Sequence, residues 1–128
     1  MNNELKIGFI GFIGFGEAGY HLAKGLRTAG ASHICAYDIH THTSGRGDKI
    51  QQRAAECEVR LLASNEELAA TANVLLSTVT ANQAQAAAEQ SAPHLDARHV
   101  YADLNSGESG RSRCGLLRGS RLRVWTPD

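Results

Sequence analysis

An apolar run that passes directly into a glycine-rich turn is the feature of this sequence that most restricts its fold. Residues 5–13 are almost wholly apolar and rich in Ile, Phe and Gly, which is typical of a strand buried on both faces of a parallel sheet. Glycines at 14, 16 and 19 follow in the spacing G-x-G-x-x-G. No other register fits, because Gly8 and Gly11 each have isoleucine two residues later. The sequence therefore predicts a central strand that ends in a phosphate-binding turn.

Beyond the turn, the sequence alternates between helical and extended patterns. Ala18, Leu22, Leu26 and Ala29 recur at helical spacing and predict an apolar helix face, with Gly30 placed to end the helix. Further strands are predicted at 33–38, 59–61, 74–78 and 100–104, and further helices at 50–57, 64–72 and 81–92. This alternation requires right-handed crossovers, so the sequence predicts a single α/β domain with a doubly wound parallel sheet of the Rossmann type.

Three local signals mark where helices begin and end. Ser64 and Glu67 form a capping box at the start of the helix 64–72. Thr80 is predicted to cap the alanine-rich helix that follows it, and Pro93 is predicted to stop that helix.

Each glycine of the turn has a predicted mechanical role. Gly14 allows the tight turn, Gly16 lets a pyrophosphate approach the backbone, and Gly19 lets the helix pack close to the strand. The helix N-terminus then offers free N–H groups and a partial positive charge to the phosphates. The predicted cofactor contact is the whole turn, namely Gly14, Phe15, Gly16, Glu17, Ala18 and Gly19.

Asp38 follows Gly19 by 19 residues and ends the second predicted strand. A carboxylate at this place accepts hydrogen bonds from the adenosine ribose, and its charge repels the extra phosphate of NADP. We therefore expect NAD as the cofactor. Arg46, Lys49 and Arg53 lie just beyond and could attract a 2′-phosphate, so NADP stays open as an alternative.

Residues 10–19, Ile-Gly-Phe-Ile-Gly-Phe-Gly-Glu-Ala-Gly, resemble the opening motif of the β-hydroxyacid dehydrogenases. That family includes the 6-phosphogluconate, 3-hydroxyisobutyrate and tartronate semialdehyde enzymes. The spacing to Asp38, the segment 73–83 and the run Asp-Leu-Asn-Ser at 103–106 are also similar, so the resemblance covers about residues 7–106. It implies the NAD(P)-binding domain of an oxidoreductase that passes hydride between nicotinamide and a small hydroxyacid.

The same resemblance implies further site residues. Val79 and Thr80 would lie beside the cofactor, while Asn105 and Ser106 would approach the nicotinamide and the substrate carboxylate. Amide and hydroxyl groups suit that task, because they can bind a carboxylate and leave the path of hydride transfer open.

The sequence departs from the family in three ways. An Ile-Gly-Phe repeat at 7–15 adds three residues, which an extended strand or a bulge must absorb. Residues 107–128 lack the expected glycine-rich substrate loop. The resemblance implies a catalytic lysine on a helical second domain, which we do not expect within these 128 residues, and Lys6, Lys24 and Lys49 match no motif. We therefore assign no catalytic residue, and expect a helical domain or a partner chain to complete the site.

Three alternatives remain at this point. The chain can be a dinucleotide-binding module without turnover, a truncated fragment, or an interaction protein that uses only the fold. Methyltransferases and flavoproteins are less favoured, because the former usually lack the third glycine and the latter usually carry glutamate where this chain has Asp38.

Residues 107–128 form an atypical basic tail. From 109 onward, five arginines stand against one aspartate, although the whole chain has 13 basic and 13 acidic residues. Arginines without interleaved aromatic residues favour a solvated surface over a nucleic-acid site. Residues 107–119 are predicted to be loop with at most one helical turn, and Leu122 and Val124 permit one more strand.

Composition and isolated motifs exclude several other classes. The chain shows neither a membrane-length apolar segment nor a signal peptide, so we expect a cytoplasmic protein. Its three cysteines form no C-x-x-C pair, which disfavours disulfides and structural zinc, although Cys57 lies near arginines that could lower its thiol pKa. His40 and His42 have no evident third ligand, so we predict no metal.

Overall fold

The computed structural model describes residues 9–104, 113–116 and 123–126. Within them, one sheet has the strand order β3-β2-β1-β4-β5-β7-β6. Its strands are β1 (Ile10–Ile13), β2 (Ile34–Tyr37), β3 (Arg60–Leu61), β4 (Val74–Ser77), β5 (Val100–Asp103), β6 (Arg113–Leu116) and β7 (Arg123–Thr126). The helices are α1 (Glu17–Thr28), α2 (Arg46–Cys57), α3 (Asn65–Thr71) and α4 (Ala84–Ser91), with 3₁₀ turns η1 (Ala81–Gln83) and η2 (Ala92–His94).

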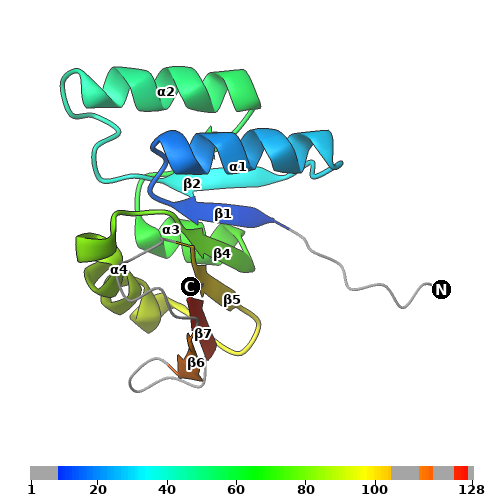
Figure 1. Ribbon diagram of the computed structural model, residues 1–128, viewed down its shortest axis with the longest axis vertical. Coiled ribbons are helices and arrows are strands. Elements are labelled where there is room, and N and C mark those ends of the chain that lie inside the picture. The colour runs from blue at the N-terminus through cyan, green and yellow to red at the C-terminus, as the bar shows by residue number, and fades with distance from the viewer. Residues whose placement is uncertain (1–8, 105–112, 117–122, 127–128) are drawn as a thin grey trace.

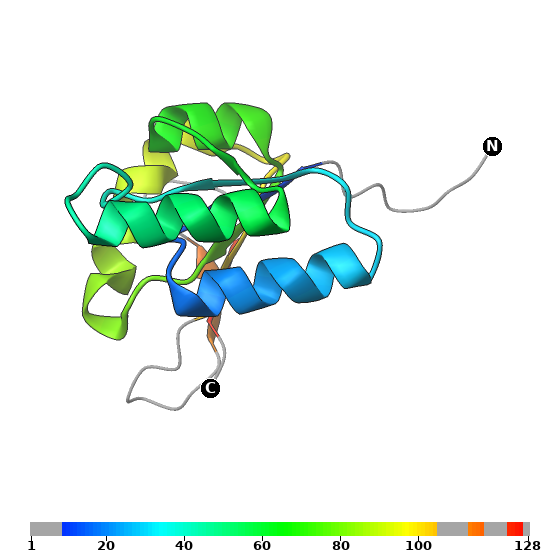
Figure 2. The ribbon, with the colours of Figure 1, turned by 90° about the horizontal axis from the view of Figure 1, so that it is seen from above.

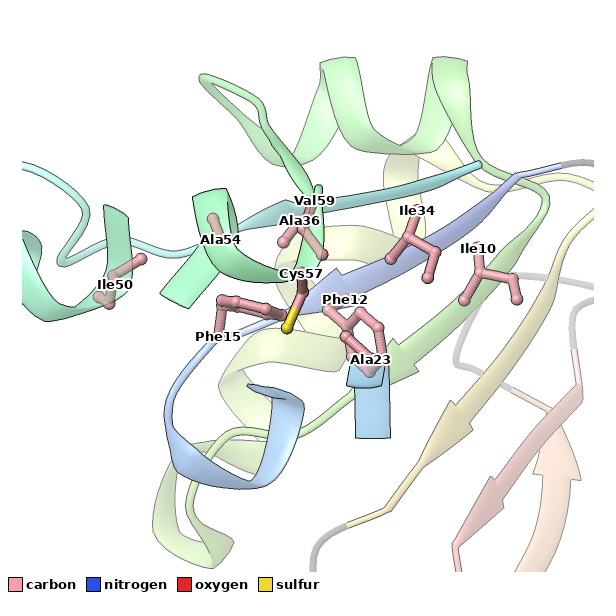
Figure 3. Packing of buried hydrophobic residues seen from close by; sticks show 10 residues of the cluster. All are labelled: Ile10, Phe12, Phe15, Ala23, Ile34, Ala36, Ile50, Ala54, Cys57 and Val59. Atoms are coloured by element: carbon pink, nitrogen blue, oxygen red, sulfur yellow. The ribbon is translucent and has the colours of Figure 1, made fainter. Parts of the chain in front are cut away.

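The sheet is covered by helices on both faces, as the doubly wound prediction requires. Helices α1 and α2 lie on one face and α3 and α4 on the other (Figures 1 and 2). Alternate residues of β1 serve the two layers: Ile10 and Phe12 pack in the cluster that includes residues of α1 and α2, whereas Ile13 packs with residues of α3 and α4. Figure 3 shows the first cluster, in which Phe12 and Phe15 meet edge to face at 5.9 Å. The predicted Rossmann-type fold is confirmed.

Strand β1 is shorter than the predicted run 5–13, because Phe9 lies outside it and residues 5–8 fall outside the described part of the chain. Residues 10–13 pair without interruption with β2 and β4, so no bulge lies within this stretch. Gly11 has a packing role: a Cβ here would be 2.8 Å from the Cβ of Ala72. The missing side chain lets the end of α3 sit directly on the strand.

The predicted buried face of α1 is right only at Leu26, which packs against the core cluster. Ala18, Leu22 and Ala29 are exposed, whereas Gly19 and Ala23 are buried. The helix packs tightly at Gly19, where a Cβ would lie 3.1 Å from the Gly14 carbonyl oxygen and from Thr78 Oγ1, and Ala23 lies one turn further along the same face. Close approach at a small residue therefore decided the helix rotation, rather than the apolar pattern.

Predictions at the other element ends have mixed outcomes. The Ser64 hydroxyl accepts a hydrogen bond from Glu67 N at 3.1 Å, which confirms that cap. Thr80 does not cap α4, because that helix begins only at Ala84, after η1, and the Thr80 hydroxyl donates to Asn82 Oδ1 at 2.6 Å. Helix α4 ends at Ser91 and Pro93 lies in η2, which confirms the predicted stop.

The segment predicted as loop at 107–119 contains strand β6, which pairs antiparallel with β7. Strand β7 pairs parallel with β5 and confirms the additional strand. Strand β6 is defined by its pairing with the neighbouring strand at 123–126. The glycines and polar residues around β6 predicted a loop, because they do not show this pairing.

Candidate functional site at the carboxyl end of the sheet

The glycine turn begins at the carboxyl end of β1, between the ends of β2 and β4. Gly14 has φ +86°, a conformation that glycine adopts at little cost. A Cβ at Gly14 would also lie 2.8 Å from Val79 Cγ1. Both observations agree with the predicted tight turn, and the second places Val79 directly beside it.

Gly16 and Gly19, the other two glycines of the turn, differ in how much free space surrounds them, in agreement with their predicted roles. A Cβ at Gly16 would meet nothing within 4 Å, so the space above it is open to a ligand. A Cβ at Gly19 would be 3.1 Å from both the Gly14 carbonyl oxygen and Thr78 Oγ1. Gly19 therefore permits the close approach of helix to turn, and Gly16 leaves open space that a side chain would occupy.

The first turn of α1 adjoins this open space. Gly16 is the N-cap residue, and no side chain caps the helix. The first helical hydrogen bond runs from Tyr20 N to Gly16 O at 3.0 Å. Glu17 and Ala18 are exposed, and Glu17 lies 3.8 Å from His21, one turn along the helix. The N-terminal N–H groups and their partial positive charge suit a phosphate.

Asp38 directly follows β2 and is half-buried at the side of the turn. Its Oδ2 accepts from Phe15 N at 2.7 Å, and its Oδ1 accepts from His40 N at 2.8 Å. Because each carboxylate oxygen accepts two hydrogen bonds, both retain acceptor capacity for ribose hydroxyls. The structure thus brings Asp38 to the glycine turn, as the spacing predicted.

Phe15 has a narrower role than its place in the motif suggests. Its ring is fully buried against Phe12, and its backbone N–H is engaged by Asp38. Only the remaining backbone of Phe15 is left for a cofactor contact.

The remaining predicted residues divide between described and undescribed parts of the chain. Val79 is half-buried beside Gly14, and Thr80 is exposed after it. Asn105 and Ser106 lie outside the described residues, so the predicted substrate contacts stay predictions.

Sequence reasoning missed Thr78. Its hydroxyl donates to the Gly14 carbonyl oxygen at 2.6 Å, and its backbone N–H donates to Ile13 O at 2.9 Å. The available signal was a hydroxyl residue directly after β4. Its importance could be recognised only by knowing that β4 lies next to β1, which is a result of the strand order.

Basic residues near the site gather between α1 and α2. A hollow of about 240 Å³ is lined by Tyr20, Lys49, Gln52, Arg53 and Glu56. The Arg53 guanidinium lies 5.6 Å from the centre of the Tyr20 ring, and the Tyr20 hydroxyl donates to Glu56 at 2.7 Å. Arg46 is exposed. Two of the three cations considered for a 2′-phosphate therefore line this hollow.

Cys35 and Cys57 are buried free thiols. Burial raises the pKa of the Cys35 thiol to about 11, and burial also raises the pKa of Cys57. Burial and the nearby Glu56 outweigh the lowering effect of Lys24 and Arg27 on the pKa of Cys57, so the net shift is opposite to the one considered from the sequence. Over the described ranges, no three His, Cys, Asp or Glu side chains are grouped for a metal ion, and no helix is long and apolar enough to cross a bilayer.

Comparison with known proteins places this geometry in a family. The family model described as NADP oxidoreductase, coenzyme F420-dependent, matches residues 9–107. A solved conserved hypothetical protein from Sinorhizobium meliloti 1021 is 38% identical over 79% of this chain, with a TM-score of 0.71. No curated protein matches the chain.

More distant structures share the fold. Plasmodium falciparum pyrroline carboxylate reductase with NADP bound is 20% identical over 75% of this chain, with a TM-score of 0.57. The prephenate dehydrogenase from A. aeolicus, solved with hydroxyphenyl propionate and NAD+, is 18% identical over 81%, with a TM-score of 0.68. The chain spans only 33%, 32% and 35% of the S. meliloti, P. falciparum and A. aeolicus structures, respectively. By its match over residues 9–107, the chain belongs to the coenzyme F420-dependent NADP oxidoreductase family and carries a Rossmann-type NAD(P)-binding domain.

Proposed function

We propose that the turn from Gly14 to Gly19 holds the pyrophosphate of a nicotinamide dinucleotide, with Asp38 facing the adenosine ribose. The observation that carries this proposal is the open space at Gly16, which adjoins an uncapped helix N-terminus and, through Phe15, a carboxylate with spare acceptor capacity. Phosphate oxygens would accept from the turn, and ribose hydroxyls would donate to Asp38. Val79 and Thr80 would line the same side of the cofactor.

The cofactor we propose as preferred is NAD. The Asp38 carboxylate would lie near the ribose 2′ position, where it disfavours a phosphate. The family description names NADP, and Lys49 and Arg53 in the α1–α2 hollow are the residues that would serve a 2′-phosphate if NADP binds better.

The reaction we propose is hydride transfer between nicotinamide and a small hydroxyacid, on the resemblance of residues 10–19 and 103–106 to β-hydroxyacid dehydrogenases. Nicotinamide supplies the hydride chemistry, and Asn105 and Ser106 would bind the substrate carboxylate. Because the chain spans about a third of the structures it matches, we propose that a helical domain or a partner chain completes the site. A binding module without turnover is the competing proposal, and the turnover assay in the Discussion separates the two.

The dinucleotide proposal is tested by fluorescence titration of NADH into the 128-residue chain and two glycine-to-valine variants. A Cβ at Gly16 or at Gly25 meets no packed neighbour within 4 Å, so the two positions are matched in open space. Only Gly16 adjoins the proposed pyrophosphate. We expect Gly16→Val to abolish NADH binding while circular dichroism shows a folded chain, and Gly25→Val to bind as the parent chain does. Equal affinity of all three would place the phosphates elsewhere.

A further inference from the structure

One peptide unit of the glycine turn is held by side chains at both of its ends. The carbonyl oxygen of Gly14 accepts from Thr78 Oγ1 at 2.6 Å, and the N–H of Phe15 donates to Asp38 Oδ2 at 2.7 Å. These two groups belong to the same planar peptide unit. Thr78 follows β4 and Asp38 follows β2, the two strands that flank β1. The unit is therefore bridged from both sides of the central strand.

Bonds at opposite ends of a rigid plane prevent its rotation. The adjoining backbone is also tied, because Gly14 N donates to Tyr37 O at 2.8 Å and Thr78 N donates to Ile13 O at 2.9 Å. Without the two side chains, the Gly14–Phe15 plane could turn, since glycine permits many backbone conformations. Such a rotation would re-aim the following N–H groups, which begin at Gly16.

The Thr78 hydroxyl is also fitted to the third glycine of the motif. It lies 3.1 Å from the position that a Cβ on Gly19 would occupy, so it fills the space between turn and helix. One hydroxyl thus meets the first and third glycines together. A valine in its place would keep the volume but leave the Gly14 carbonyl without this donor.

We propose that Thr78 is a positioning residue for the dinucleotide, acting with Asp38 to lock the Gly14–Phe15 peptide in the orientation that aims the turn's N–H groups at the pyrophosphate. This inference rests on the proposed function for its ligand, but the locked peptide is a property of the free chain. Thr78 acts through the turn and need not touch the cofactor. Its effect falls on the pyrophosphate, which NADH and NADPH share.

The binding test compares Thr78→Val, Thr78→Ser and Thr28→Val in the full chain by calorimetry. Thr28→Val is the matched control, because Thr28 Oγ1 donates to the Lys24 carbonyl oxygen at the far end of α1. We expect Thr78→Val to weaken NADH and NADPH by the same factor, about five- to tenfold. Thr78→Ser should restore affinity, and Thr28→Val should leave it unchanged. Parental affinity in a folded Thr78→Val variant, or a failure of serine to restore it, would overturn the inference.

A second measurement needs no ligand. Amide hydrogen exchange by NMR should show the Phe15 N–H protected in the parent chain and in Thr78→Ser, and exchanging at least tenfold faster in Thr78→Val. Equal exchange rates of the Phe15 N–H in the parent chain and in Thr78→Val would contradict the proposal that Thr78 locks this peptide. If exchange behaves as expected but the parent chain binds neither NADH nor NADPH, the proposed function fails and the ligand assignment of this inference fails with it. The two failures are therefore distinguishable.

Discussion

At the scale of single residues, Asp38 has a structural role in the glycine turn and a proposed role in binding the cofactor. Its carboxylate accepts hydrogen bonds from Phe15 N in the glycine turn and from His40 N in the following loop. We propose that it also accepts hydrogen bonds from the ribose hydroxyls. A substitution here changes both the shape of the turn and the local charge. Its effects on absolute affinity and on cofactor preference therefore have different causes.

Cofactor preference is the first prediction at this scale. NAD(H) should bind more tightly than NADP(H) by about 1 kcal/mol or more, because Asp38 repels the 2′-phosphate at a partly exposed site. Asp38→Ala should narrow that gap by removing the charge, and should weaken both cofactors by releasing Phe15 N. Calorimetry with each cofactor measures both effects. Equal or tighter binding of NADPH by the parent chain would contradict the argument from charge.

Two glycines of α1 predict opposite effects on stability. Gly25→Ala should raise the free energy of unfolding by about 0.5–1 kcal/mol, because alanine is the better helix former and the Cβ enters open space. Gly19→Ala should lower it by about 1–3 kcal/mol, since the Cβ would lie 3.1 Å from the Gly14 carbonyl oxygen. Urea unfolding followed by circular dichroism checks both. A change of the same sign in the two variants would show that Gly19 is not a packing position.

At the scale of elements, the loop between β2 and α2 links Asp38 to the helical layer. Thr41 is buried, and its hydroxyl donates to the Asp38 carbonyl oxygen at 2.8 Å. Gln51 of α2 donates to the Thr41 carbonyl oxygen at 2.8 Å. Gly47, in the first turn of α2, packs against the same carbonyl so closely that a Cβ would lie 2.1 Å from its oxygen. The start of α2 therefore sets the path of the loop that follows Asp38.

Gly47→Ala should disturb this loop. We expect about 1–3 kcal/mol of lost stability, together with weaker NADH binding, because the new Cβ must displace backbone rather than a flexible side chain. Chemical denaturation and NADH titration at a temperature where the variant is folded are the measurements. Gly45→Ala is not a suitable control, since Gly45 has φ +84°. Gly25→Ala serves as the control instead. If Gly47→Ala binds NADH as tightly as the parent chain does, the loop after Asp38 does not influence the cofactor site.

At the scale of the whole molecule, the described site residues lie together at one edge of the sheet. The glycine turn, Asp38 and Val79 gather where parallel strands end, as in open α/β sheets generally. Lys24 and Lys49 lie on α1 and α2 near Tyr20, and neither matches a family motif. The matched part of this chain covers only about a third of those structures, so their remaining parts have no counterpart among residues 9–107.

We therefore expect the 128-residue chain alone to bind NAD(H) but to turn over no hydroxyacid at a useful rate. A positioned proton-transfer group typically contributes about 10²- to 10⁴-fold in rate, and a closed cleft adds substrate orientation. NADH formation over a panel of small 3-hydroxyacids and 6-phosphogluconate is the measurement. Robust turnover that Ser106→Ala or Asn105→Ala removes would show that the chain completes its own site, or that a second copy does.

The sequence by itself determined the fold class, the glycine turn and the place of Asp38. Those features depend on local chemistry: a run of apolar residues, glycines where the backbone needs them, and an acid at the end of the next strand. The Ser64 cap and the Pro93 stop were predictable for the same reason, since each acts within a few residues.

Only the tertiary structure decided which face of α1 is buried, where β6 pairs, and how the turn is held. Helical spacing predicted that Leu22 faces the core. In the structure Leu22 is exposed, because α1 packs at Gly19 against Thr78, the residue after β4. Strand β6 pairs with residues 123–126, and the hydroxyl of Thr78 reaches Gly14 across 64 residues of sequence. Close packing and long-range hydrogen bonds are set by which strands become neighbours, and that order is a property of the folded chain.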